Sequence, residues 1–419
     1  MRRLSSITLL SGILCFSTAC SPDASSAPAG ETTEDNPHQS QSRYHLRFTA
    51  SFEPENQQVS VTLDVDQRNH LLRQLNLNMP PDRYAMDNHP QTTREGDRVL
   101  WQVGNRGGQL SWKVPTSALS TRSPADATIT PAWALVKLDD IFPAATTRTL
   151  KGASSVSTLV LSGPKDWRFE TAYGPVNSGP VAVQTERNFN RPKGWMLAGD
   201  LGIRRTQIAG RRFSVAAPKG SGMARMDVIA YLNWIVPDLI NIFPEFPERT
   251  LIIGAPNELW RGGLSGFQSL YLHQDRPIVS ENATSPMIHE LVHVAGVHSA
   301  APGSDWLVEG LAEYYALEIL RRSGGISDKR FNDAISFQKA WAERENAPLK
   351  SPSSGAHTAY AVTVMHDLAL ELEDRGISLD TITRQLLDAE EISASQLRSL
   401  VKNALGQPSS ALNAAVPPK

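Results

Sequence analysis

Residues 287 to 295 read Met287-Ile288-His289-Glu290-Leu291-Val292-His293-Val294-Ala295, with two histidines four positions apart and a glutamate directly after the first. Residues four apart lie on one face of an α-helix, so both imidazoles can bind one metal ion. Glu290 stands where a carboxylate can act as general base toward water. The other positions are apolar, and Ser285-Pro286 predicts an N-cap followed by proline in the first turn. The stretch therefore predicts a buried helix, beginning at Pro286, that supports hydrolytic zinc chemistry.

A second stretch supplies a third candidate ligand. It reads Asp305-Trp306-Leu307-Val308-Glu309-Gly310-Leu311-Ala312-Glu313-Tyr314-Tyr315. Catalytic zinc sites have three protein ligands and leave one position for water. With Asp305 as the expected N-cap of a second helix, Glu309 lies in its first turns and can complete the set. Glu313 lies one helical turn further on the same face, where it can accept the ring N–H of a ligand histidine.

Together the two motifs resemble the gluzincin zinc metallopeptidases, especially the aminopeptidase N-type and glycyl-aminopeptidase-like branches. In those enzymes a Trp-x-x-Glu-Gly segment carries the third zinc ligand, and it corresponds to Trp306, Glu309 and Gly310. Thermolysin-like relatives place an acid four residues after that ligand, which corresponds to Glu313. The resemblance implies Zn²⁺ as cofactor, His289 and His293 as its other ligands, and a thermolysin-like α/β catalytic domain.

A third stretch, Gly262-Gly263-Leu264-Ser265, extends the resemblance. It is similar to the edge strand that lines the substrate cleft in the glycyl-aminopeptidase-like branch, where the sequence is Gly-Gly-Leu-Glu-His. An edge strand can pair with an extended peptide through main-chain hydrogen bonds. Ser265 and Gly266 replace the Glu and His of the relatives, and that glutamate binds the free amino terminus of a substrate. The replacement favours endopeptidase activity or an unusual substrate.

The relatives also carry a tyrosine at the start of a C-terminal helix, where its hydroxyl stabilises the oxyanion. Tyr360 is the candidate here, because a phenol beside zinc can donate a hydrogen bond to developing negative charge. The lysine and glycine that usually follow this tyrosine are missing.

A different metal motif fits less well. Gly296 occupies the glycine position of the metzincin pattern H-E-x-x-H-x-x-G-x-x-H, but Ser299 falls where the third histidine belongs. His298 is one residue early, and Met365 is the one later methionine. We expect His298 to lie at the helix end, where the helix dipole favours a cation.

The amino terminus predicts a location. A basic start and the apolar stretch from Ile7 to Phe16 precede Ser17-Thr18-Ala19-Cys20, which resembles a bacterial lipoprotein signal peptide over residues 1–20. We expect lipidation of Cys20 and attachment to the outer membrane, facing the periplasm. Ordinary cleavage near Ala19 is the alternative, and it would give a periplasmic or secreted protein. Both cysteines, Cys15 and Cys20, lie in this segment, so no disulfide is expected in the mature protein.

The remaining sequence predicts a multidomain α+β protein. A flexible tether rich in Ser, Pro, Ala and Thr is expected over 21–43, followed by an antiparallel β-sandwich over 44–194 with alternating apolar residues. The thermolysin-like domain is expected over 195–325, a helical domain over 326–410 and a disordered tail over 411–419. The 41 basic and 43 acidic residues give a net charge of −2, which offers no electrostatic case for nucleic acid.

These features predict a zinc-dependent metallopeptidase of the cell envelope that hydrolyses peptides or proteins. The alternative is a zinc-containing binding or structural envelope lipoprotein with little or no turnover, since the altered edge strand could mean that catalysis has been lost.

Overall fold

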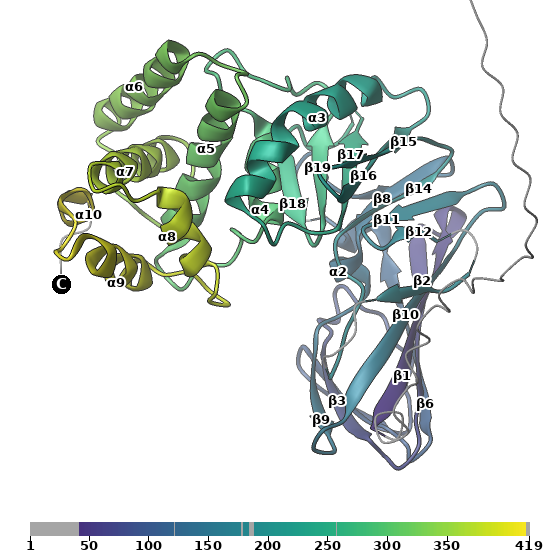
Figure 1. The fold of residues 1–419 in the computed structure, drawn as a ribbon. Helices are drawn as coiled ribbons and strands as arrows, with labels where there is room; N and C mark the ends of the chain where they lie inside the picture. Colours follow the sequence, from purple (N-terminus) through teal and green to yellow (C-terminus); the bar gives the residue numbers. More distant parts are fainter. Residues whose placement is uncertain (1–41, 121, 177–178, 184–187, 257, 416–419) are drawn as a thin grey trace, which may run out of the picture. The chain divides into compact units, whose positions relative to one another are not determined.

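The computed structural model describes residues 42–120, 122–176, 179–183, 188–256 and 258–415. The predicted signal peptide, the lipidated Cys20 and nearly all of the predicted tether lie outside the described residues, as do residues 416–419. The described chain is a mixed α+β protein with several sheets followed by helices, which confirms the predicted fold class (Figure 1).

The first sheet forms one layer of the amino-terminal β region and has the strand order β13-β10-β1-β2-β6. Its strands are β1 (Arg43–Glu53), β2 (Gln58–Asp66), β6 (Gly107–Pro115), β10 (Ser154–Ser162) and β13 (Val181–Val183). Alternate residues of β1 are buried, as its apolar alternation predicts. The pairs of this sheet are antiparallel, as predicted, except that β1 and β10 run parallel. Alternation indicates which face of a strand is buried and is the same for either direction of its partner.

Two further sheets complete this region, with orders β4-β5-β3-β9 and β12-β11-β14-β8-β7. Their strands are β3 (Leu72–Asn78), β4 (Thr92–Glu95), β5 (Arg98–Gln102), β7 (Thr128–Ile129), β8 (Trp133–Lys137), β9 (Ala145–Thr149), β11 (Arg168–Thr171), β12 (Gly174–Pro175) and β14 (Trp195–Gly199). The connections between the strands of this region include two 3₁₀ turns (η1, Pro54–Asn56; η2, Thr116–Ala118) and α2 (Leu138–Ile141). Because β14 pairs with β8 and β11, this region continues to Gly199 rather than ending at residue 194.

The next region is a five-stranded sheet, β15-β16-β17-β19-β18, with helices packed on it. The elements are β15 (Leu201–Ile208), β16 (Arg211–Pro218), α3 (Arg225–Ile242), β17 (Arg249–Ala255), β18 (Gly263–Gly266), β19 (Ser269–His273) and α4 (Pro286–Val294). β16, β17 and β19 run parallel, whereas β18 is antiparallel to β19 and forms the edge of the sheet. α4 packs against β18 and β19, so the helix with the two histidines lies on the edge of the sheet.

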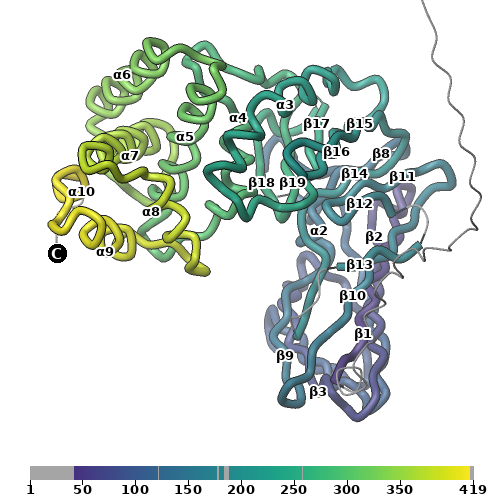
Figure 2. The backbone as a smooth tube through the Cα atoms, viewed as in Figure 1, coloured from purple at the N-terminus to yellow at the C-terminus, as the bar shows by residue number. Residues whose placement is uncertain are grey.

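Helices make up the rest of the described chain. They are α5 (Asp305–Arg322), α6 (Asp328–Arg344), α7 (Ala356–Glu373), α8 (Leu379–Leu386), α9 (Ala394–Leu405) and α10 (Ser410–Ala415). α5 packs against both α4 and α7 (Figure 2). No helix in the described ranges is long and apolar enough to cross a membrane.

The last helix differs from the sequence expectation of a disordered tail from residue 411. The Glu371 carboxylate accepts hydrogen bonds from the backbone N–H groups of Ser410 and Ala411, at 2.8 and 3.2 Å. Leu412 of the same helix is buried against the helical core. A carboxylate contributed by α7 thus stabilises the first turn of α10, together with the Ser409 hydroxyl, which accepts the N–H of Leu412 at 3.1 Å.

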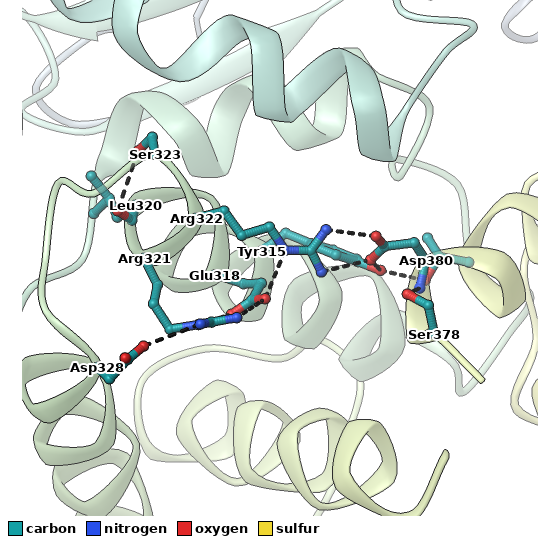
Figure 3. Close-up of polar contacts among 10 residues, drawn as sticks. Tyr315, Glu318, Leu320, Arg321, Arg322, Ser323, Asp328, Ser378 and Asp380 are labelled. Atoms are coloured by element: carbon teal, nitrogen blue, oxygen red, sulfur yellow. Dashed lines mark hydrogen bonds and ion pairs between the residues drawn. The ribbon is translucent and has the colours of Figure 1, made fainter. Parts of the chain in front are cut away.

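The carboxyl-terminal end of α5 is fixed to α8 by a cluster of charged side chains, shown in Figure 3. The Arg322 guanidinium donates to Glu318 at 2.7 Å and to Asp380 at 2.6 Å. Arg321 also donates to Glu318, and the Tyr315 hydroxyl donates to Asp380 at 3.1 Å. We call these five residues the α5–α8 ion cluster. Because both carboxylates are largely buried and paired with arginine, the cluster fixes the position of α5.

Candidate metal centre

Three side chains from α4 and α5 converge at one point. The Nε2 atoms of His289 and His293 lie 3.1 Å apart, as expected for residues one helical turn apart. Glu309 of α5 approaches both rings, with carboxylate oxygens 3.4 Å from Nε2 of His289 and 3.7 Å from Nε2 of His293. These are the residues predicted as metal ligands, and their ligand atoms form a group compact enough to hold one ion.

The sequence around α4 explains how the histidines are placed. Pro286 is the first residue of the helix, and the Ser285 hydroxyl accepts the N–H of Ile288 at 3.3 Å, as the sequence predicts. The apolar residues between the histidines are buried in the core, which fixes the rotation of the helix about its axis. Both histidines therefore face α5.

The other nitrogen of each imidazole is hydrogen-bonded to the protein. Nδ1–H of His289 donates to Glu313 at 2.9 Å, the contact that the one-turn spacing from Glu309 predicts. Nδ1–H of His293 donates to the carbonyl of Val297. These bonds fix both rings in the tautomer that leaves Nε2 free to act as a ligand.

The cluster also has a defined charge balance. Burial lowers the pKa of His289, but hydrogen bonds with Glu309 and Glu313 outweigh it and raise the pKa well above its ordinary value. Burial and the charge of His289 lower the pKa of His293 to about 4. Burial raises the pKa of Glu309, but the bond with His289 and the charge of His293 lower it overall. Without metal, an imidazolium thus lies between two carboxylates, an environment that also suits a metal cation.

Glu290 points toward the edge strand. Its side chain is buried, with 8% of the residue exposed, and it is hydrogen-bonded by the hydroxyl and the backbone N–H of Ser265. Burial raises the pKa of the Glu290 carboxyl. A Cβ atom at Gly263 would lie 2.8 Å from Oε1 of Glu290. Glycine at 263 therefore lets the strand backbone approach the carboxylate closely.

The predicted substrate strand lies beside this carboxylate. Gly263, Leu264 and Ser265 belong to β18, and Gly262 precedes it, its carbonyl accepting the N–H of His273 at 3.1 Å. Leu264 packs in part against a small core formed with Tyr271. The structure thus brings the predicted substrate residues to the edge strand next to Glu290.

Two sequence expectations fare differently. Tyr360, on α7, lines a cavity of about 750 Å³ together with Trp306, and its catalytic role stays a prediction. Asp305 was expected to be the N-cap of α5, which was wrong because Ser304 occupies that position. The Asp305 carboxylate instead accepts the N–H of Ser353 at 2.6 Å, fastening a loop to the start of α5.

The metzincin alternative receives no support. Among the described residues, the group able to hold a metal contains Glu309 as its third member and does not contain His298. The contacts of His293 with the Val297 carbonyl and of Glu290 with Ser265 were not predicted from the sequence. The first involves a backbone atom, and the second joins elements whose packing no local spacing specifies.

Comparison with solved structures places this geometry in a known fold. An aminopeptidase N family protein from Idiomarina loihiensis matches with a TM-score of 0.62 at 14% identity, over 87% of this chain and 76% of that chain. Native yeast LTA4 hydrolase matches with a TM-score of 0.57 at 13% identity, over 89% of this chain and 66% of that chain. The yeast LTA4 hydrolase complex with bestatin gives 0.58 at 12% identity, over 90% and 69%.

No protein-family model matches the sequence, and no curated protein matches it. At 12 to 14% identity the likeness establishes the fold. That fold is the multidomain one of the aminopeptidase N family protein and LTA4 hydrolase. The resemblance to gluzincins that the motifs predicted is therefore confirmed at the level of the fold.

Proposed function

We propose that this protein is a zinc metallopeptidase that hydrolyses peptide bonds, with His289, His293 and Glu309 as the metal ligands. The observation that carries the proposal is the spacing of the ligand atoms. A tetrahedral zinc ion bound at about 2.1 Å separates its ligand atoms by about 3.4 Å. Here the two Nε2 atoms are 3.1 Å apart, Oε2 of Glu309 lies 3.4 Å from Nε2 of His289, and Oε1 of Glu309 lies 3.7 Å from Nε2 of His293, so the donor set fits zinc.

The chemistry follows from the residues around the cluster. Bound zinc would supply Lewis acidity, which polarises a carbonyl and makes water more acidic. Glu290 would take the proton of the attacking water and deliver it to the leaving amine, a role that a raised carboxyl pKa favours. Ser265 holds that carboxylate against β18, and Glu313 holds His289 in the required tautomer.

Glu290→Gln tests the proposal, with Glu281→Gln as a matched control on an exposed residue nearby. Metal content and hydrolysis of a peptide library are measured for both variants and for His293→Ala. We expect Glu290→Gln to keep about one zinc per chain and to lose activity by roughly 10²–10⁴-fold. The control should change neither quantity, and His293→Ala should lose the zinc.

Full activity in a pure Glu290→Gln preparation would refute the mechanism. Absence of zinc from the wild type after reconstitution would refute the metal assignment. Zinc without turnover of any peptide would favour the alternative of a binding or structural protein.

We also propose a cell-envelope location, which rests on the amino-terminal sequence alone. Cys20 follows small residues after an apolar stretch, as in a lipoprotein signal. Metabolic labelling with a palmitate analogue should mark the wild type and fail to mark Cys20→Ala. Equal labelling of the two would exclude lipidation at Cys20, and no labelling of either would favour a soluble periplasmic or secreted form.

A further inference from the structure

β18, the strand that holds the proposed general base, has two different faces. It has four residues and, within the described part of its sheet, pairs with β19 alone. Gly263 and Ser265 lie on the face toward α4, where Ser265 bonds the Glu290 carboxylate. Leu264 and Gly266 lie on the opposite face. Because so short a strand has few ladder bonds, its position depends on what packs against each face.

Trp195, the first residue of β14, supports the face opposite Glu290. It is buried, and its ring centroid lies 5.3 Å from that of Tyr271, the β19 residue paired with Leu264. A Cβ atom at Gly266 would lie 3.1 Å from Cδ1 of Trp195. β18 is thus enclosed between α4 on one face and the start of β14 on the other.

Ser269 joins β14 to the turn between β18 and β19. This serine is fully buried at the start of β19, and its hydroxyl accepts the backbone N–H of Trp195 at 2.8 Å. The same hydroxyl donates to the carbonyl of Phe267, in the turn, at 2.9 Å. The Phe267 ring centroid lies 5.9 Å from that of Tyr173, which also belongs to the amino-terminal β region. Replacing Ser269 by alanine would leave a buried N–H unsatisfied and release the turn.

Gly194 sets how closely the turn approaches β14. Its φ of +87° and its place against the turn both require glycine, because a Cβ atom would meet the Phe267 carbonyl and lie 2.7 Å from Oγ of Ser269. The Gly194 N–H donates to Asp139 of α2 at 2.7 Å, and its carbonyl accepts the N–H of Leu138 at 2.8 Å. α2 therefore fixes the backbone on which the turn rests.

We infer that Ser269 is a positioning residue for the proposed hydrolysis. By tying the turn to Gly194 and Trp195, it fixes β18 at the depth at which Ser265 bonds the Glu290 carboxylate. This inference rests on the proposed function, because it requires Glu290 to act as general base. The amino-terminal β region thus takes part in catalysis by holding that base, through β18, in one position.

Ser269→Ala tests the inference in the zinc-loaded protein, with Ser157→Ala as the matched control at another fully buried serine. The substrate is the library peptide that the wild type cleaves fastest. We expect Ser269→Ala to lower kcat about tenfold, with KM changed by less than about twofold and zinc content unchanged, because the general base is displaced. The control should behave as wild type in all three quantities.

A second comparison tests whether the effect passes through Ser265. In the Ser265→Ala enzyme the hydroxyl bond to Glu290 is already lost, so adding Ser269→Ala should lower kcat further by about threefold or less. A further loss of about tenfold would mean that the two serines act independently, and it would overturn the inference.

Phe267→Ala provides a milder test, because this side chain is only partly buried. The change removes the contact of the turn with Tyr173, and kcat should fall about threefold. Phe337→Ala, at an exposed phenylalanine of α6, is the control and should leave kcat unchanged. Should Ser269→Ala fail to fold, this comparison decides alone.

Wild-type kcat in Phe267→Ala and in folded Ser269→Ala would overturn the inference and leave the proposed peptidase intact. A wild type that cleaves no peptide would overturn both.

Discussion

The two halves of α5 hold carboxylates in two different electrostatic environments. In the first half, Glu309 and Glu313 contact imidazoles, whose charge depends on protonation. In the second half, the Glu318 side chain is only 6% exposed and contacts the guanidinium groups of Arg321 and Arg322, which remain charged. One helix thus carries a cluster that can exchange a proton for a metal ion and a cluster whose charge is fixed.

The difference teaches how to separate functional from structural acids in a fold of this kind. Arginine beside an acid removes the need for any other cation. An acid that contacts histidine still requires a cation when the imidazole is neutral, and a metal ion bound to that imidazole can provide the charge. Metal binding should therefore change how much the first half of α5 contributes to stability and leave the contribution of the second half unchanged.

The largest effect is expected from Arg322→Met. It removes the cation shared by Glu318 and Asp380 and leaves buried carboxylates poorly compensated, which should lower stability by about 3 kcal/mol with or without zinc. Glu309→Gln should abolish the stabilisation by zinc and lower metal-free stability by under about 1 kcal/mol. Urea unfolding in chelator and in zinc measures both. A destabilisation by Arg322→Met that appears only with zinc would contradict the comparison.

The next effect is on metal affinity. Glu313→Gln weakens the hydrogen bond that orients His289 and should lower zinc affinity by roughly 10–100-fold. Asp328→Asn is the matched control, since its carboxylate is 82% exposed and contacts Arg321. Competition with a chromophoric chelator gives both affinities. Equal affinities in the two variants would mean that Glu313 does not support the ligand.

A smaller effect is expected from Gly263→Ala. The added Cβ would crowd the Glu290 carboxylate and displace the general base, so kcat should fall roughly tenfold while the zinc content stays the same. Gly222→Ala is the control, because the added Cβ would lie 3.6 Å from the nearest atom, which is an ordinary van der Waals contact. Steady-state kinetics and metal analysis distinguish the variants. Unchanged kcat in Gly263→Ala would mean that the position of Glu290 tolerates the change.

The smallest effect is expected at α10 and depends on pH. Burial raises the pKa of Glu371, but its hydrogen bonds to Ser409, Ser410 and Ala411 outweigh it and lower the pKa. The folded-state pKa is then below the unfolded one, so the stabilisation is present above the unfolded value and disappears as pH falls through the folded value.

Glu371→Gln should therefore speed hydrogen exchange of the α10 amides a few-fold at neutral pH, with the rest of the chain unchanged. Glu373→Gln, an exposed acid on the same helix, is the control. Identical exchange in both variants would show that the Glu371 carboxylate does not stabilise α10.

The sequence predicted that His289, His293 and Glu309 could form one compact group, and the contacts within each helix follow from helical spacing. His289 and His293 are one turn apart, and so are Glu309 and Glu313, which fixes each pair without knowledge of the fold. The start of α4 was also predicted from local sequence, because Ser285 is a typical N-cap residue and Pro286 a typical first helical residue. The approach of α5 to α4 was expected from the need for a third ligand, and the family resemblance supported it.

The features that sequence did not predict all depend on distant partners. The parallel pairing of β1 with β10 joins segments about a hundred residues apart. The alternation of apolar and polar residues in a strand does not indicate whether its partner runs parallel or antiparallel. The contact of Ser265 with Glu290 depends on how α4 packs on the sheet. The first turn of α10 is stabilised by Glu371, which lies about forty residues earlier in the sequence, on α7.

The pairing of Arg322 with Asp380 has a consequence for the order in which the protein matures. These residues are 58 positions apart, so in a growing chain that stops before Asp380 the Arg322 guanidinium can contact Glu318 and lacks its second carboxylate. The same helix presents Glu309. The contacts that join the end of this helix to α8 are therefore complete only after residue 380 has been synthesised. A chain that ends before α8 would contain all three possible metal ligands and lack the ion pair that fixes the end of the helix carrying the third.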